Sequence, residues 1–319
     1  MSLSSELGIV GIIVLEFALV LGISPLLSGV IRKIKSRSQG RVGFPIFQSY
    51  RDLGKLFHKG SVYAESASAV TEWAPLISFG ALIAAIPLVP WLVLPSPFGF
   101  AGDLILFVGL LALSRFMTAL AALDAGSTFG GMGSTRDMWI GALLEPAFLL
   151  TIFAWGAPSG STGASTIALH SISLGLANFS PPMLLATTAF VFVLFAETGR
   201  LPFDNPATHL ELTMIHEAMV LDYSGRELLL IEWGKAVKFT LLTGLLLTVL
   251  LPWGLSLSLG ILVLLAIAVV VAKLLGASVI IGALETRFAK LRLFRVVDFA
   301  AVATVLALGS ISLTYLVGV

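Results

Sequence analysis

Ionisable side chains that lie inside long apolar stretches are the residues of this chain best placed to do chemistry. Glu16, Arg115, Glu145 and Lys273 each interrupt such a stretch. A charge at the centre of a bilayer costs about 3 kcal/mol on insertion scales, so these side chains should face a helix-bundle interior and either pair or carry protons. Pro146 follows Glu145, and its ring leaves a backbone carbonyl free beside the carboxylate. We therefore predict a proton relay at Glu145; a static ion pair with Arg115 or Lys273 is the alternative.

Glu16 and Lys273 are each open to two interpretations. Lys273 lies in a run from residue 261 to 281 that carries no other charge, so its ammonium group has to find a partner or water within the membrane. It either pairs or takes part in transport. Glu16 either relays protons or bonds to a neighbouring segment.

A second group of carboxylates lies between residues 197 and 232, where few cations accompany them. Carboxylates that crowd together titrate as a coupled set in which some pKa values are raised, so such a set can store and pass protons. The alternative is a solvated acidic loop. The carboxylates are Glu197, Asp204, Glu211, Glu217, Asp222, Glu227 and Glu232.

Part of this segment has the start signal of a helix. Asn205 can cap it and Pro206 can take its first position, so we expect a helix that runs to about Leu221 and packs against the bundle or a partner. His209 and His216 would then lie about 10 Å apart along the axis, which is too far for the two imidazoles to share one metal ion. We expect no metal site here.

The elements that must position these residues are membrane helices. The 319 residues are 57% hydrophobic and 12% charged, with a mean hydropathy of +1.02, which excludes an ordinary soluble domain. A span needs about 20 mostly apolar residues. The sequence predicts an all-α, polytopic protein with one transmembrane domain over residues 1–319 and a retained first helix. The eight expected spans are roughly 6–30, 74–95, 103–123, 139–157, 181–197, 238–255, 258–284 and 298–318.

The cations outside these spans all fall on one side. The connections 31–73, 124–138, 198–237 and 285–297 hold them, whereas the connections 96–102, 158–180 and 256–257 hold no Lys or Arg. The positive-inside tendency therefore predicts that the charged loops are cytoplasmic and that both termini face outward.

Three shorter features have structural interpretations. Residues 134–137 (Ser-Thr-Arg-Asp) fit a capping box that opens the fourth span, and Gly130, Gly131 and Gly133 before it predict a flexible turn rather than a nucleotide site. The Gly/Ser/Thr-rich residues 159–166 are typical of a flexible loop. The chain has no cysteine, which excludes disulfides and cysteine-ligated zinc or iron–sulfur centres from it.

Several loop motifs together resemble a known family. The segment Glu197-Thr-Gly-Arg-Leu-Pro-Phe-Asp204 followed by Tyr223-Ser-Gly225 resembles the long loop of the membrane subunit that anchors the peripheral arm of respiratory complex I and of group 4 membrane-bound [NiFe] hydrogenases. Residues 41–57, 114–137 and 285–295 look like the formate hydrogenlyase and hydrogenase-4 type of this subunit. Phe44, between Gly43 and Pro45, departs from the family's usual Gly-Pro.

The resemblance implies a docking role for the first and third charged connections. They would seat a peripheral electron-transfer module made of hydrogenase large and small subunits, which would hold the NiFe centre and the iron–sulfur clusters, while this chain holds no cofactor. Basic residues 41–59 could bind an acidic partner face or anionic lipid. The predicted docking residues are Arg41, Gln48, Arg51, Asp52, Lys55, Pro202, Phe203 and Tyr223.

The resemblance also implies coupling to ion movement. Redox chemistry in the partner would shift the loop 197–222, change carboxylate protonation and drive protons or sodium ions toward Glu145 and neighbouring antiporter-like subunits in the cell (inner) membrane. Arg200 and Arg115 would act as counter-charges. The predicted coupling residues are Glu145, Glu197, Asp204, Glu211, Glu217, Asp222, Arg115, Arg200 and Lys273.

Two other functions stay open at this point. One keeps the fold and makes the chain a quinone-binding subunit of a respiratory dehydrogenase, although the sequence lacks that group's Asn-Arg-Val-Gly element. The other is an independent secondary ion transporter, which the absence of matching broken helices in two halves disfavours. Neither the composition nor the motifs indicate nucleic-acid binding.

Overall fold

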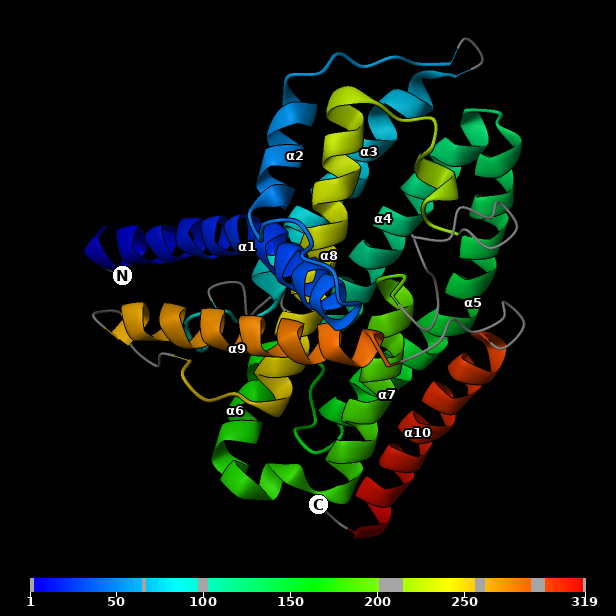
Figure 1. Ribbon diagram of the computed structural model, residues 1–319. Coiled ribbons are helices and arrows are strands. Elements are labelled where there is room, and N and C mark those ends of the chain that lie inside the picture. The colour runs from blue at the N-terminus through cyan, green and yellow to red at the C-terminus, as the bar shows by residue number, and fades with distance from the viewer. Residues whose placement is uncertain are drawn as a thin grey trace.

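The computed structural model describes residues 3–64, 67–96, 103–200, 215–255, 262–287 and 296–317. Within these ranges every regular element is a helix, which confirms the predicted all-α class (Figure 1). The helices are α1 (Leu3–Ser38), α2 (Gln48–Phe57), α3 (Ala69–Ala85), α4 (Leu104–Asp124), α5 (Thr128–Gly156), α6 (Ala164–Leu174), α7 (Pro181–Glu197), α8 (Gly225–Leu250), α9 (Leu262–Glu285) and α10 (Val296–Val317). Short 3-10 helices cover Ile86–Leu88, Gly175–Phe179 and Ala218–Val220.

Most of the long helices match predicted spans. In the described part of the chain, seven helices are long and apolar enough to cross a membrane, or eight if α6 and α7, which meet at a 104° bend, form one span. Helix α7 coincides with the predicted span 181–197. The chain is a multi-pass membrane protein.

Some predicted boundaries were wrong, because tertiary contacts override local signals. Helix α5 already begins at Thr128, and Ser127 caps it by accepting a hydrogen bond from the Gly130 N–H at 3.1 Å. The predicted capping box at residues 134–137 and the glycine turn before it are therefore helix interior. The missing side chain of Gly133 serves packing instead, because a Cβ there would lie 2.9 Å from the Ile215 carbonyl oxygen.

Three connections also hold more helix than expected. Helix α6 and the 3-10 helix Gly175–Phe179 together occupy most of the connection 158–180, and the first turn of α6 lies within the predicted flexible loop 159–166. Helix α8 begins at Gly225, inside the connection 198–237, and α1 continues to Ser38. Conversely, residues 215–221 are a turn and a 3-10 helix rather than the end of an α-helix. Polar contacts to α5 and α8, described below, hold that segment in place of helical hydrogen bonds.

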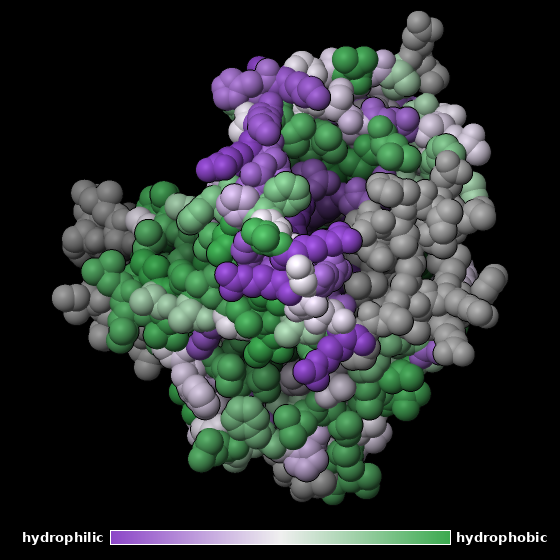
Figure 2. Space-filling model, in the orientation of Figure 1, coloured by the Kyte–Doolittle hydropathy of each residue, from purple (hydrophilic) through white to green (hydrophobic). Residues whose placement is uncertain are grey.

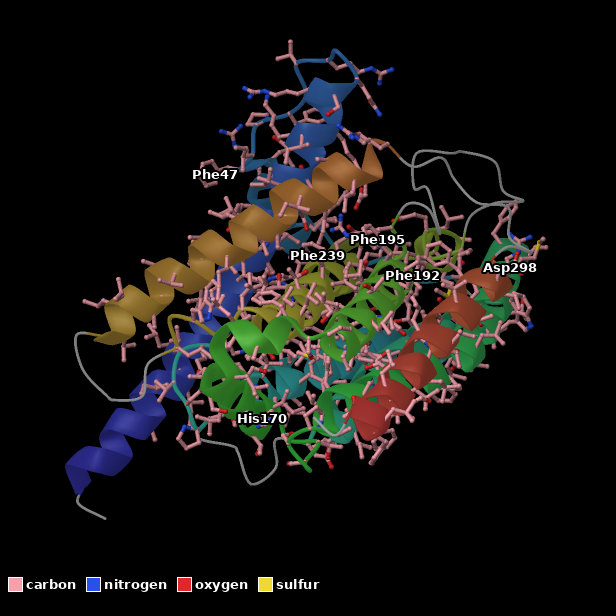
Figure 3. The ribbon with its side chains drawn as sticks, turned by 90° about the horizontal axis from the view of Figure 1, so that it is seen from below. Phe47, His170, Phe192, Phe195, Phe239 and Asp298 are labelled. Carbon is pink, nitrogen blue, oxygen red and sulfur yellow. The ribbon has the colours of Figure 1, made fainter. Side chains whose placement is uncertain are left out.

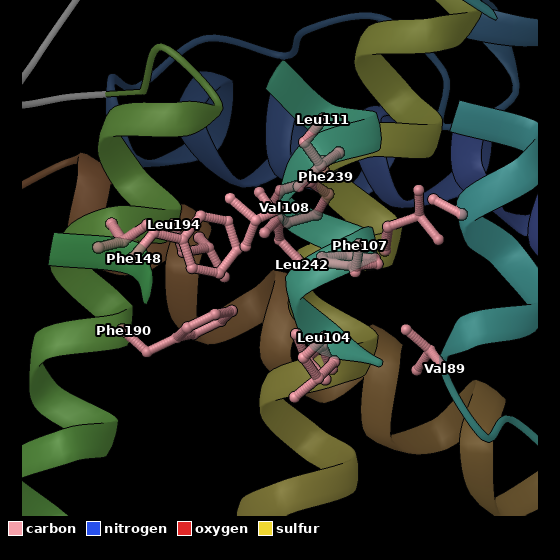
Figure 4. Close-up of a cluster of buried hydrophobic side chains, with 14 of the residues drawn as sticks. Val89, Leu104, Phe107, Val108, Leu111, Phe148, Phe190, Leu194, Phe239 and Leu242 are labelled. Carbon is pink, nitrogen blue, oxygen red and sulfur yellow. The ribbon is translucent and has the colours of Figure 1, made fainter. Parts of the chain in front are cut away.

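An aromatic and aliphatic core joins the helices (Figure 4). Phe148 of α5 contacts Phe107 of α4 and Phe190 of α7 edge-to-face, with ring centroids 6.5 Å and 5.6 Å apart. Leu104 and Leu242 are fully buried in the same cluster. Edge-to-face pairs contribute about 0.5–1.5 kcal/mol beyond their buried area, so this core fixes α4, α5 and α7 relative to one another.

Helix α9 lies across the bundle, next to α1 and over α8 (Figure 1). Its last residue, Glu285, meets Lys35 of α1 and Arg200, which follows α7. Asp137 of α5 lies 3.3 Å from His216. Residues from all four cation-bearing connections thus meet at one end of the bundle.

Candidate functional site

A cavity of about 380 Å³ opens at this end of the molecule, between α1, α2, α4 and α8 and the segment 215–220. Figure 2 shows hydrophilic side chains gathered around a hollow beside α1 and α2. Its walls combine apolar residues with charged residues from several helices, and most of those charges are paired with one another.

The deepest of these pairs form a chain across four helices. The Arg115 guanidinium of α4 donates to Glu145 Oε1 of α5 at 3.1 Å and to Glu197 Oε1 of α7. Lys238 Nζ of α8 lies 2.7 Å from the other oxygen of Glu197. The side chains of Glu197 and Arg115 are 1% and 8% exposed, whereas that of Glu145 is 41% exposed on this chain. The chain of charges therefore runs from the cavity to a lateral face of α5.

A second cluster closes the cavity on the α9 side. Glu285 is fully buried and pairs with Lys35 and with Arg200, whose Nη1 lies 2.8 Å from Glu285 Oε1. The Arg200 guanidinium also lies over the Phe239 ring, 3.9 Å from its centroid. Burial lowers the pKa of Arg200, and the adjacent Glu285 carboxylate opposes that shift. This cluster ties α1, α8 and α9 together.

A third cluster lies on α8 itself. Lys235 Nζ bonds to Glu232 Oε1 at 2.8 Å, one turn earlier, and to Glu217 Oε1 at 3.0 Å. Glu217 belongs to the segment 215–220, so this cation holds the segment against α8. His216, the preceding residue, reaches Asp137 on the opposite wall.

The residues that follow the segment 215–220 are held by hydrogen bonds rather than by ion pairs. Ser127 donates to Asp222, and the Tyr223 hydroxyl donates to the Thr71 carbonyl oxygen at 3.1 Å. Tyr223 is buried, and burial raises its pKa well above the usual tyrosine range. Tyr223 therefore binds α3 from inside the fold, rather than standing on the surface where a docking residue was expected.

Of the predicted docking residues of the first connection, Gln48, Arg51, Asp52 and Lys55 lie on α2, and Arg41 lies between α1 and α2. Arg41, Arg51 and Lys55 are exposed, and Gln48 donates to Asp52 at 2.8 Å one turn away. The neighbouring Phe47 is 62% exposed and lies at the edge of the molecule, away from Phe239 and Phe195 among the helices (Figure 3). This face of α2 offers cations and aromatic rings together.

Other predicted residues are elsewhere. Lys273 donates to the carbonyl oxygens of Leu251 and Trp253, just beyond α8, and does not reach Glu145. Glu16 is buried and accepts a hydrogen bond from the Leu92 N–H at 3.3 Å. The predictions for Pro202, Phe203, Asp204 and Glu211 fall outside the described residues.

Sequence reasoning missed several residues of the cavity. Lys235 and Lys238 are not among the predicted site residues, although their spacing of three, continued back to Glu232, places all three side chains on one face of a helix. Asp137 was assigned to a cap. Glu285 ends a long apolar run and opens the motif 285–295, but neither feature indicates its partners. Among the described residues, no three His, Asp or Glu side chains converge to hold a metal ion.

Comparisons with known proteins agree with the resemblance seen in the loops. Formate hydrogenlyase subunit 4 of Escherichia coli (strain K12) is 34% identical over 279 residues, which cover 86% of this chain and 89% of that protein. Hydrogenase-4 component C of the same organism is 34% identical over 239 residues, or 75% of this chain and 74% of that protein.

The fold has a solved counterpart. A chain of the membrane-bound sulfane sulfur reductase, an archaeal respiratory membrane complex, superposes with a TM-score of 0.82 at 22% identity, over 96% of this chain and 99% of that one. A family model described as NADH dehydrogenase matches residues 10–315. Because that model spans nearly the whole chain, and both E. coli relatives are 34% identical over three quarters of it or more, the chain belongs to the NADH dehydrogenase family.

Proposed function

We propose that this chain is the membrane subunit of an energy-converting hydrogenase or formate hydrogenlyase complex. It docks a peripheral module that holds the NiFe centre and iron–sulfur clusters, and it couples electron transfer there to translocation of protons or sodium ions. The two 34%-identical relatives support this assignment over others in the family. The charged end of the bundle faces the cytoplasm, and the complex lies in the cell (inner) membrane.

The observation that carries the proposal is the chain of charges from the cavity to Glu145. Lys238, Glu197, Arg115 and Glu145 lie in sequence across four helices, each within ion-pair distance of the next. In such a chain, a charge added at one end changes the preferred protonation of every later carboxylate. Moving one elementary charge against 100 mV costs about 2.3 kcal/mol, which electrostatic changes within a chain this short can supply.

The exposure of Glu145 supports a neighbouring membrane subunit. A carboxylate that is 41% open at membrane depth is unstable against hydrocarbon, so another protein should cover this face of α5. Exposed Met138 and Trp139 extend the same helix toward the charged end. An antiporter-like subunit here would receive ions from Glu145.

The docking face is the α2 side of the cavity. Exposed Arg41, Arg51 and Lys55 provide positive charge, and Phe47 and Phe57 provide apolar area. Arginine and aromatic side chains are enriched in protein interfaces, which favours a protein partner over lipid alone. A peripheral module bound here would lie over the mouth of the cavity.

The test separates electron transfer from ion movement. The intact complex carrying Glu145→Gln is reconstituted in vesicles, and hydrogenase turnover and ion uptake are measured on the same sample. We expect turnover to continue while uptake per turnover is lost, because the amide keeps the shape of the side chain but cannot accept a proton. Glu72→Gln, at an exposed carboxylate of α3, is the matched control and should leave both rates unchanged. Full uptake in the Glu145→Gln complex would exclude a relay through this residue.

A quinone-binding subunit is the second candidate, and the cavity volume favours it. About 380 Å³ is within the range of small-ligand pockets, and the cavity lies beside α1 and α2. The density of paired charges on its walls is unlike a pocket for an apolar ring, which is why we place this function second. Solvent extraction of the purified complex would distinguish the two: stoichiometric quinone without a nickel-bearing partner favours this alternative.

A further inference from the structure

We propose that Asp137 and His216 form the proton-uptake pair of this subunit, which takes protons from the cavity and passes them to the Arg115–Glu197–Lys238 chain. The inference deepens the proposed function and rests on it. It assigns a role to a carboxylate that local sequence signals explain as a helix cap and that the structure places well inside α5.

Asp137 has the surroundings of a proton carrier. It is 3% exposed and lines the cavity, and its Oδ1 lies 3.3 Å from His216 Nε2. Its second oxygen, Oδ2, is buried and has no hydrogen-bond partner among the described residues. A buried carboxylate oxygen without a partner is costly, and a proton or a water molecule satisfies it.

The position of Asp137 on α5 connects it to the relay. Asp137, Gly141 and Glu145 are spaced by four residues and share one face of the helix, about 12 Å from end to end by the rise per residue. The Arg115 guanidinium occupies the gap between them, directly against Gly141. Asp137 therefore lies one helical turn from the point where Arg115, the cation that holds both Glu145 and Glu197, contacts α5.

Two glycines leave the room that His216 and its neighbours need to lie close to α5. Gly199 has φ +56°, and a Cβ there would lie 2.7 Å from His216 Nδ1, so a side chain would displace the imidazole. On α5, a Cβ at Gly133 would lie 2.9 Å from the Ile215 carbonyl and 3.0 Å from Ala218 Cβ. The segment 215–220 thus packs on α5 one turn from Asp137, and the His216–Asp137 contact is a polar contact within this packing.

The proposed step is a simple proton transfer. A proton from cavity water binds Nε2 of the neutral imidazole and then passes from Nε2 to Asp137 Oδ1, which returns the imidazole to its neutral form. The Asp137 carboxylic acid then passes its proton through cavity water to the Glu197 carboxylate, which lines the same cavity and is paired with Arg115. The other charged groups on the cavity walls nearby are Arg115, Glu197, Arg200, Glu217, Lys235 and Lys238.

The test uses the intact complex in vesicles, with hydrogenase turnover and ion uptake measured together. Asp137→Asn should retain turnover and lose uptake per turnover, and Asp137→Glu should restore most of the uptake because it restores a carboxylate. Asp298→Asn, an exposed acid at the start of α10, is the matched control and should behave as wild type. His216→Gln, on a non-helical segment, gives a second variant if Asp137→Asn fails to assemble, and should also lose uptake.

A spectroscopic readout separates a proton carrier from a structural role. Infrared difference spectra on reduction of the complex should contain a carboxylic-acid band that disappears in Asp137→Asn and shifts in Asp137→Glu. Normal uptake in both Asp137→Asn and His216→Gln would overturn the pair. If Glu145→Gln abolishes uptake in the same series, only the uptake pair is wrong; if Glu145→Gln also pumps normally, the proposed function fails first.

Discussion

Substituting Gly141 with alanine should dislodge Arg115 from its seat on α5. An added Cβ would overlap Arg115 Nη1 and lie 3.2 Å from Cζ and 3.3 Å from Cδ. Non-bonded carbon atoms pack at about 3.5–4.0 Å, so the guanidinium would have to move by roughly 1 Å. Its hydrogen bond to Glu145 is already 3.1 Å long and would not survive such a shift away from α5.

The expected loss of stability comes from breaking the Arg115–Glu197 ion pair. Unpairing a buried ion pair costs about 3–5 kcal/mol, but Lys238 stays 2.7 Å from Glu197 and compensates for part of this. Replacing glycine with alanine in a helix returns about 1 kcal/mol. We include no free-energy cost for the broken Arg115–Glu145 contact, because 41% of the Glu145 side chain is exposed and can interact with its surroundings. The net expectation is a destabilisation of about 1–3 kcal/mol.

The assay is thermal unfolding of the purified complex in detergent, with uptake per turnover as a second readout. Gly131→Ala is the control, since it lies on the same helix and an added Cβ there meets nothing within 4 Å. It should be neutral or slightly stabilising. Equal melting temperatures and equal uptake per turnover in the two variants would show that the position of Arg115 does not require glycine at residue 141, and would refute the reasoning.

Three other substitutions test the frame around the site. Lys273→Met should lower the melting temperature by an amount equivalent to about 1–3 kcal/mol, because two carbonyl groups beyond α8 lose their hydrogen-bond donor. Ion uptake per turnover should be unchanged. A large loss of uptake per turnover would assign transport to Lys273. Gly225→Ala should destabilise more than Gly131→Ala, because φ is +55° and a Cβ would lie 2.6 Å from the Gly60 carbonyl oxygen; comparison of the two melting temperatures decides it. The Tyr63 hydroxyl donates to Glu227, and burial and this carboxylate raise the Tyr63 pKa to about 12. The contribution of this hydrogen bond to stability is therefore present below pH 10 and fades as pH rises toward 12. We expect wild type and Tyr63→Phe to have the same tyrosinate absorbance up to about pH 11.

The sequence predicts the architecture well because membrane insertion constrains it so strongly. Long uncharged runs can only be spans, and span 181–197 coincides with α7. The Arg115–Glu145 contact is one of the two pairings that this logic left open for Glu145, because a buried arginine must find an acid. These inferences depend on the lipid environment alone, which the composition reveals.

The remaining details depend on contacts between distant segments, which no local pattern encodes. Ser134 and Asp137 have capping-box spacing, but Ser127 caps the helix seven residues earlier. The turn that holds Ser134 packs against the distant segment at Ile215, where Gly133 leaves room for its carbonyl. The pairing of Glu285 has no local signal, since its partners Lys35 and Arg200 come from other parts of the chain. The identities of the pairs in the cavity therefore required the structure.

The half-open position of Glu145 has a consequence for biogenesis. Until another subunit covers α5, the newly inserted chain exposes the Glu145 carboxyl group to lipid acyl chains, which costs about 3 kcal/mol. This cost leaves the unassembled subunit susceptible to membrane proteases. We expect pulse-chase experiments to show a short half-life when the chain is synthesised alone, and a longer one for Glu145→Leu. The side chain that we propose as an ion relay in the finished complex would then also limit the lifetime of unassembled copies.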